Sequence, residues 1–148
     1  MQTKVSDLLA VKGSDVICIN RNVSVFEANK TLVNNNVGAV LVRDEKEKLA
    51  GIYTERDVLK QSVRRSDQLK TTLVKDVMTT DLIIGLSDDK IDYLMGIMTF
   101  NKIRHIPILE NGEIRGVISI GDLVKSQLHD ARYENRYLKD YIMGKYPG

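Results

Sequence analysis

The hydrophobic positions of the chain change their period in a definite order. Residues 15–19 form a short apolar run of the kind found in buried strands. Ser24, with Glu27 three residues later, has the pattern of a helix N-terminus, and the apolar residues that follow recur at helical spacing. Residues 39–42 and 51–53 are again apolar runs around a charged turn, and a second helix is expected after them. The first part of the chain therefore predicts strand, helix, strand, strand and helix.

The second part of the chain has the same order. Residues 82–84 are expected to form a strand, and apolar residues at i, i+3, i+4 and i+7 between positions 91 and 98 predict a helix. The strands expected at 106–109 and 113–119 flank Asn111-Gly112, the dipeptide best suited to a two-residue hairpin turn. The pattern predicts a second unit built like the first.

Short motifs confirm that the chain contains a repeat. Val-Ser-Asp-Leu-Leu at residues 5–9 returns as Val-Lys-Asp-Val-Met at residues 74–78, and the segment 51–60 returns as 116–125. The offset, about 65 to 69 residues, is too long for a solenoid unit and is typical of a duplicated small domain. A polar segment without apolar periodicity separates the two copies and is expected to be a linker.

These observations predict an α/β (α+β) fold made of two β-α-β-β-α repeats. The first repeat is expected at residues 1–64, the linker at 65–73, the second repeat at 74–128 and a C-terminal helical tail at 129–148. Each repeat has few residues with which to build a core. We therefore expect the repeats to pack on each other as a pseudo-twofold pair and to share one core.

Both repeats contain a motif of Gly, two apolar residues, Thr or Ser, two variable residues and Asp, where a strand passes into a helix. In a structural interpretation, Thr54 or Ser119 is the helix N-cap and Asp57 or Asp122 completes a capping box. In a functional interpretation, the free N–H groups of the helix attract phosphate and the carboxylate accepts from ribose hydroxyls. Both interpretations can be correct if the cap lies at the rim of a cleft and can exchange its partner for a ligand.

Composition and charge narrow the classes of function. The 148 residues carry a net charge of +2, too small to drive binding to nucleic acid or to an anionic membrane. No apolar stretch approaches the roughly 20 residues that cross a bilayer, and the N-terminus lacks a secretory signal, so we expect a cytoplasmic protein, or one of an organelle matrix if the sequence is a eukaryotic mature form. Cys18, the single cysteine, and two histidines are too few for a metal site, and Cys18 is expected to be buried and inert.

The ordered set of motifs resembles a tandem pair of cystathionine-β-synthase (CBS) domains, the Bateman module. The resemblance covers residues 5–126 and rests on the two opening segments, on Asn-Lys-Ile-Arg-His-Ile-Pro-Ile at 101–108, and on the two motifs that end in Asp57 and Asp122. It implies a regulatory module that binds AMP, ATP or NAD in clefts between the repeats, needs no cofactor and has no catalytic activity. Small stand-alone proteins of this kind, which the chain resembles, form homodimers and signal to a separate partner protein.

The resemblance also implies two nucleotide sites. In the first, Thr54 and Asp57 hold phosphate and ribose, backbone of the other repeat contacts adenine, and Arg56 adds a guanidinium. The second lacks the cations of the first, so fewer phosphate contacts are expected there. The first site comprises Thr54, Arg56, Asp57, Ile83, Ile84, Arg104, His105 and Pro107. The second site comprises Val16, Ile17, Gly38, Ala39, Ser119, Gly121 and Asp122.

Several of these residues allow a second interpretation. Arg104 can equally be a solvated surface arginine, and His105 a partly buried imidazole that contacts no ligand. Beyond the second repeat, Tyr133, Tyr137 and Tyr141 recur every four residues and cover one helix face. This stripe can pack on the protein's own helices, or it can contact a partner or a second protomer.

Two functions from different classes follow. The first is a homodimeric adenine-nucleotide sensor, in which a ligand that bridges the repeats changes a surface read by an unknown downstream protein. The alternative is a ligand-independent interaction scaffold, in which both motifs are only helix caps and the tyrosine-rich tail recruits partners. An enzyme is not expected, because the sequence has no nucleophile with a base, no metal ligand set and no P-loop lysine.

Overall fold

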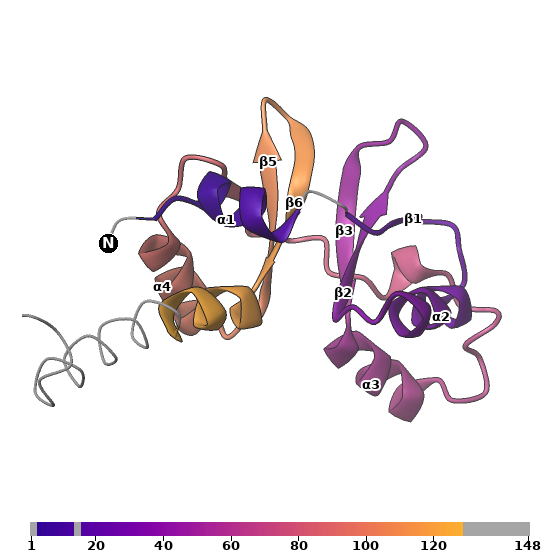
Figure 1. Ribbon diagram of the computed structural model, residues 1–148. Coiled ribbons are helices and arrows are strands. Elements are labelled where there is room, and N and C mark those ends of the chain that lie inside the picture. Colours follow the sequence, from indigo (N-terminus) through magenta and orange to yellow (C-terminus); the bar gives the residue numbers. More distant parts are fainter. Residues whose placement is uncertain (1–2, 14–15, 129–148) are drawn as a thin grey trace, which may run out of the picture.

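The computed structural model of the chain describes residues 3–13 and 16–128, which form two similar lobes (Figure 1). Each lobe contains a three-stranded sheet, with strand order β1-β2-β3 in one and β4-β5-β6 in the other. In both sheets the first two strands pair in parallel and the last two pair antiparallel. This arrangement confirms the predicted α+β fold of paired repeats. The tail expected at 129–148, with its tyrosine stripe, lies outside the described residues.

The first lobe follows the predicted order of elements. It consists of β1 (Cys18–Asn20), α2 (Val25–Asn35), β2 (Ala39–Arg43), β3 (Leu49–Thr54) and α3 (Glu55–Arg64). The helix start expected at Ser24 is confirmed, because the Ser24 hydroxyl accepts a hydrogen bond of 3.1 Å from the backbone N–H of Glu27. Helix α2 is followed by Asn36, which adopts the left-handed conformation that asparagine tolerates well.

The second lobe has the matching elements. It consists of the 3-10 turn η1 (Val74–Asp76), β4 (Gly85–Leu86), α4 (Ile91–Asn101), β5 (His105–Glu110), β6 (Glu113–Ser119) and a helix that begins at residue 120. Asn111 and Gly112 have φ angles of 52° and 77°, the two positive values that a primed hairpin turn requires. The predicted hairpin is therefore confirmed. Among the described residues, no helix combines the length and the apolar character needed to cross a membrane.

The first strand of each repeat is shorter than predicted and lies further along the chain. Strand β1 begins at Cys18, and residues 82–84 are not a strand, because β4 consists of Gly85 and Leu86 only. Gly85 packs closely on β5: a Cβ atom there would lie 2.7 Å from Cδ1 of Ile108. Leu82 and Ile83, which precede it, line the space between the lobes instead.

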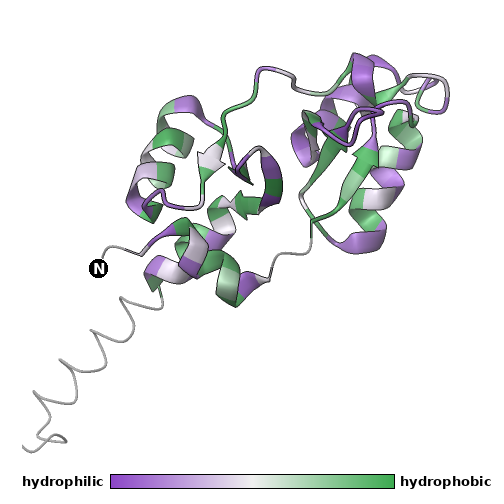
Figure 2. Ribbon diagram, turned by 90° about the horizontal axis from the view of Figure 1, so that it is seen from above, coloured by the Kyte–Doolittle hydropathy of each residue, from purple (hydrophilic) through white to green (hydrophobic). Residues whose placement is uncertain are grey.

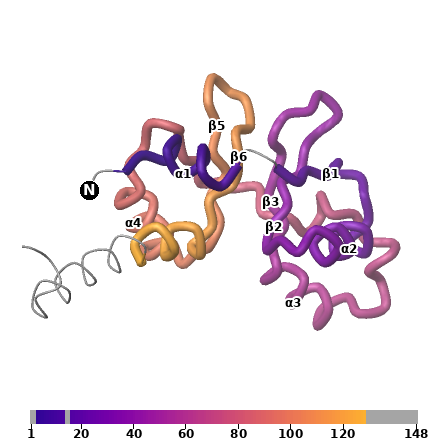
Figure 3. Tube along the Cα trace, viewed as in Figure 1, coloured from indigo at the N-terminus to yellow at the C-terminus, as the bar shows by residue number. Residues whose placement is uncertain are grey.

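The opening segment of each repeat packs on the other lobe. Residues 5–9 begin helix α1 (Val5–Lys12), which the sequence pattern did not predict, and α1 lies beside β5 and β6 (Figure 3). The backbone N–H of Val5 donates to the carbonyl of Asp89 at 2.8 Å. In the same way, the N–H of Val74, at the start of the second repeat, donates to the carbonyl of Val23 at 2.8 Å. The repeats are thus joined by a reciprocal exchange of their first segments.

The exchange gives each lobe its own hydrophobic core, so the expectation of one shared core is wrong. The strands at the centre of each lobe are largely hydrophobic (Figure 2). The core of the first lobe contains Val25, Ala28, Leu32, Val40, Val42, Tyr53 and Val74. The core of the second contains Val5, Leu9, Ile91, Leu94, Met98, Ile106, Ile108, Ile118 and Leu123. Segments from the opposite repeat supply the apolar area that a repeat of this size lacks.

Candidate functional site

A cleft of about 730 Å³ lies between the two lobes, within the usual size range of small-molecule sites. Both lobes contribute to its wall: β3 and α3 on one side, and the segment before β4, the start of β5 and the end of β6 on the other. Its lining residues are Gly38, Ile52, Thr54, Glu55, Arg56, Asp57, Leu59, Lys60, Thr79, Asp81, Leu82, Ile83, Ile103, Arg104, His105, Pro107, Ser119, Ile120 and Gly121.

The first repeated motif lies on this wall, where β3 passes into α3. Asp57 accepts hydrogen bonds from the backbone N–H of Thr54 at 2.9 Å and from its hydroxyl at 3.3 Å. The bond from the Thr54 N–H belongs to the capping box that the structural interpretation predicts. Both hydrogen bonds end on Oδ2, which leaves Oδ1 of the carboxylate to accept from a ligand. Because the side chain is also part of the cleft wall, the cap lies where the functional interpretation needs it.

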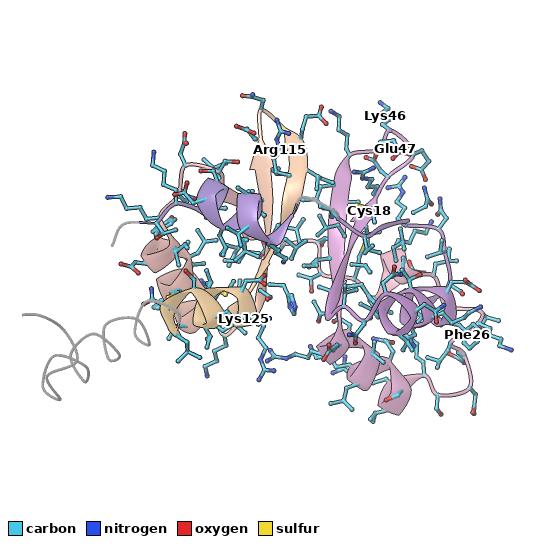
Figure 4. The ribbon with its side chains drawn as sticks, viewed as in Figure 1. Cys18, Phe26, Lys46, Glu47, Arg115 and Lys125 are labelled. Carbon is cyan, nitrogen blue, oxygen red and sulfur yellow. The ribbon has the colours of Figure 1, made fainter. Side chains whose placement is uncertain are left out.

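Basic side chains from both repeats line the same cleft. Arg56 and Lys60 come from α3, and Arg104 comes from the turn before β5. The Arg56 guanidinium reaches the second lobe, where Nη1 donates to the carbonyl of Lys102 at 3.4 Å. By contrast, Lys46 and Arg115 lie on the hairpins of their lobes (Figure 4) and do not line the cleft. The cleft therefore holds cations from both lobes together with the carboxylates of Glu55, Asp57 and Asp81.

His105 of the second lobe lies close to Gly38 of the first lobe. A Cβ atom at Gly38 would lie 2.9 Å from Oε1 of Glu55 and 3.0 Å from Nε2 of His105, so a larger residue there would require these side chains to shift. Burial lowers the pKa of His105, and the nearby Lys12 and Arg104 lower it further, against the opposing effect of Glu55 and other acidic groups. The imidazole is thus favoured in its neutral form.

The second repeated motif has a different partner. The N–H of Ser119 donates to Oδ2 of Asp122 at 2.8 Å, and the N–H of Asp122 donates to Oγ of Ser119 at 3.1 Å, so this motif is also a helix cap. Nζ of Lys12, from α1, lies 2.6 Å from the same Oδ2. Burial alone would raise the pKa of Asp122, but its hydrogen bonds to Lys12 and Ser119 outweigh burial and lower it.

The structure brings most residues of the first expected site to one cleft. The residues that line it are Thr54, Arg56, Asp57, Ile83, Arg104, His105 and Pro107, whereas Ile84 is 40% exposed and does not. Of the second expected site, Gly38, Ser119 and Gly121 line this same cleft, and Val16, Ile17, Ala39 and Asp122 do not.

Sequence reasoning missed several residues of the site. Glu55, Lys60, Thr79 and Asp81 line the cleft, and Lys12 binds the second motif. One signal was present in the repeat: Lys12 and Asp81 each lie seven residues after the valine that opens their repeat. That spacing could have marked both as equivalent residues near the motifs.

Cys18 lies on β1 and belongs to none of these contacts. Burial raises the pKa of its thiol, and Arg43 opposes that rise. The side chain is only partly buried, in contrast to the fully buried thiol expected. The raised pKa still favours the unreactive thiol over the thiolate.

Comparison with known proteins gives consistent matches. The family model described as "CBS domain" matches residues 5–64 and 74–129. The CBS domain-containing protein CBSX3, mitochondrial, of Arabidopsis thaliana is 36% identical over 152 aligned positions, which cover 97% of this chain and 74% of the relative.

Solved structures agree with this match. The CBS-domain protein ATU1752 of Agrobacterium tumefaciens is 40% identical and superposes with a TM-score of 0.82, over 86% of this chain and 95% of the other. The CBS domain pair of the protein MJ0100, solved with 5′-methylthioadenosine and S-adenosyl-L-methionine, is 25% identical with a TM-score of 0.75, over 89% of this chain and 99% of the other.

Proposed function

The chain belongs to the CBS domain family, whose domain pairs are regulatory and can bind adenosine ligands, and we propose that it senses an adenine nucleotide in the cleft between its lobes. The observation that carries the proposal is the placement of the Thr54/Asp57 motif on a cleft whose opposite wall holds Arg104 and His105. The proposed ligand is AMP, ATP or NAD, and the pair of adenosine ligands bound by MJ0100 supports this class.

The ribose and the phosphate are bound at the start of α3. Oδ1 of Asp57 accepts hydrogen bonds from the ribose hydroxyls while Oδ2 keeps the cap of the helix. The Thr54 hydroxyl exchanges its bond to Asp57 for one to a phosphate oxygen, and N–H groups of α3 after Glu55, whose own N–H donates to Gly38, add donors where the helix dipole favours negative charge. One short segment thus binds two parts of the nucleotide.

The opposite lobe completes the site. Arg104 adds a guanidinium whose donors match phosphate oxygens, and Arg56 adds another from the first lobe. Adenine lies against residues 82–83, which line the cleft and are outside the sheet, so that their backbone is available to the base edge. A ligand held in this way contacts both repeats and stabilises one spacing between them.

This bridging is the means of regulation. A nucleotide shifts the equilibrium between two lobe arrangements by no more than its difference in affinity for them. We propose that a homodimer passes this shift to a downstream protein. Exposed apolar side chains on α3, α4 and the helix from residue 120, among them Leu59, Phe100 and Val124, support a surface for such contacts. A cytoplasmic or organelle-matrix location is proposed with it, and the mitochondrial plant relative supports the second of these.

Calorimetry on the whole chain tests the proposal. We expect AMP, ATP or NAD to bind the wild type, and Asp57→Asn, which retains a capping oxygen but not the charge, to weaken binding at least tenfold. Asp67→Asn is the matched control, because Asp67 is an exposed residue of the linker. Unchanged binding in Asp57→Asn would show that the site is wrongly assigned.

The alternative, a ligand-independent scaffold, is favoured by one observation: both motifs act as helix caps without any ligand. It predicts that none of the three nucleotides raises the melting temperature. A nucleotide-dependent rise that Asp57→Asn removes would exclude it.

A further inference from the structure

Lys12 connects the start of the first repeat to the motif of the second. It is the last residue of α1, which packs on the second lobe. Its Nζ lies 2.6 Å from Oδ2 of Asp122 and also donates to the backbone carbonyl of Val117 on β6. A single ammonium therefore bridges the outer strand of the sheet and the carboxylate of the motif.

The two motifs differ in this respect although their caps are alike. Asp57 lines the cleft, and its carboxylate bonds only to the Thr54 cap among the described residues. Asp122 does not line the cleft, although Ser119 and Gly121 beside it do. The carboxylate of Asp122 thus has a cation in hydrogen-bond contact, whereas that of Asp57 has none among the described residues.

The difference arises from equivalent positions of the repeat. Lys12 lies seven residues after Val5, and Asp81 lies seven residues after Val74. Asp81 lines the cleft beside the first motif, whereas Lys12 pairs with the second. The repeat therefore places an anion at the first motif and a cation at the second. A ribose hydroxyl would meet a different charge at each motif.

The contact is partly exposed to solvent. The side chains of Lys12 and Asp122 are 36% and 20% exposed. The lowered pKa of Asp122 agrees with a carboxylate that is held ionised by the ammonium and by Ser119. The ammonium shares Oδ2 with the helix cap and so places a cationic donor against a carboxylate that would otherwise accept hydrogen bonds from ribose hydroxyls.

We propose that Lys12 is a built-in competitor of nucleotide ribose at Asp122, so that the free protein binds nucleotide at the first motif and keeps the second closed. This inference rests on the proposed function and concerns its regulation. A second nucleotide binds only when Lys12 leaves Asp122. Since Lys12 ends α1, opening the second motif is coupled to the helix that joins the two repeats.

The stoichiometry of AMP binding, measured by calorimetry on the whole chain, tests the proposal. The wild type is expected to bind one AMP per chain, and Lys12→Met to bind two. The added binding is expected to disappear in the double variant Lys12→Met/Asp122→Asn. Lys12→Arg, which retains a cation for Asp122, is expected to bind one. Lys46→Met, which removes an exposed lysine from the β2–β3 hairpin, controls for the loss of one charge (Figure 4).

Three results would overturn the proposal. In one, Lys12→Met, with the circular dichroism of the wild type, still binds one AMP. In another, the wild type binds two and Lys12→Met binds fewer, which would make Lys12 a phosphate ligand. In the third, Lys12→Arg binds two. The proposed function fails separately, when the wild type binds no nucleotide or when Asp57→Asn leaves its binding unchanged.

Discussion

Replacing Leu9 by alanine should destabilise the second lobe, although Leu9 belongs to the first repeat. The Leu9 side chain is 9% exposed, belongs to the core around α4, β5 and β6, and packs over Gly116, where a Cβ would lie 2.8 Å from Leu9 Cδ2. Truncation removes three carbon atoms, each worth about 0.8 kcal/mol when buried. The cavity left behind adds to this loss, so we expect the free energy of unfolding to fall by about 3 kcal/mol.

Urea unfolding followed by circular dichroism measures the loss, and Val11→Ala is the control. Val11 lies on the same helix but is 87% exposed, so its truncation should change stability by less than about 0.5 kcal/mol. Hydrogen exchange should show that amides of β5 and β6 lose more protection than those of β2 and β3, because the cores are separate. A loss below about 1 kcal/mol for Leu9→Ala, or equal losses in both variants, would refute the packing of α1 on the second lobe.

Two further predictions concern ionisation. The lowered pKa of His105 means that the unfolded chain binds its proton more readily, so stability should fall as pH drops below the ordinary value of 6.5, and His105→Asn should reduce this fall in urea unfolding between about pH 7.5 and 5. If the stability of His105→Asn falls equally over this pH range, His105 is not the cause of the fall. Hydrogen bonds from Arg21, from the backbone and from Asn22 lower the pKa of Glu45 to about 2, and NMR titration of Arg21→Gln should move it toward 4.5. An unmoved value would exclude Arg21 as the main cause.

The local elements were largely predictable because their signals are local. The cap at Ser24 and the turn at Asn111-Gly112 depend on residues within a few positions, and the structure has both. The strand expected at 82–84 was wrong, because an apolar run is equally suited to a strand and to a cleft wall. Only the pairing of Gly85 with Ile108 decides where β4 begins.

The part of the candidate site that consists of recognisable sequence motifs was predictable. The motif ending in Asp57 and the segment with Arg104 and His105 were recognised from the sequence, and the structure brings them to one cleft. Lys12 and Glu55 were missed, because their roles depend on which lobe α1 packs against and on how closely Gly38 approaches His105. Such contacts join residues far apart in the chain and leave no local pattern.

The sequence by itself determined that the chain is a repeat, that each copy alternates strands and helices, and that each ends in a capped helix start bearing a carboxylate. Periodicity, turn residues and caps act over a few residues, so one sequence is enough to read them. The tertiary structure alone decided that the opening segments exchange lobes, that each lobe has its own core, and that Lys12 lies on one carboxylate while the other faces the cleft. The reason is physical: each small repeat must bury its apolar faces, and which partner buries them depends on the packing of the whole chain.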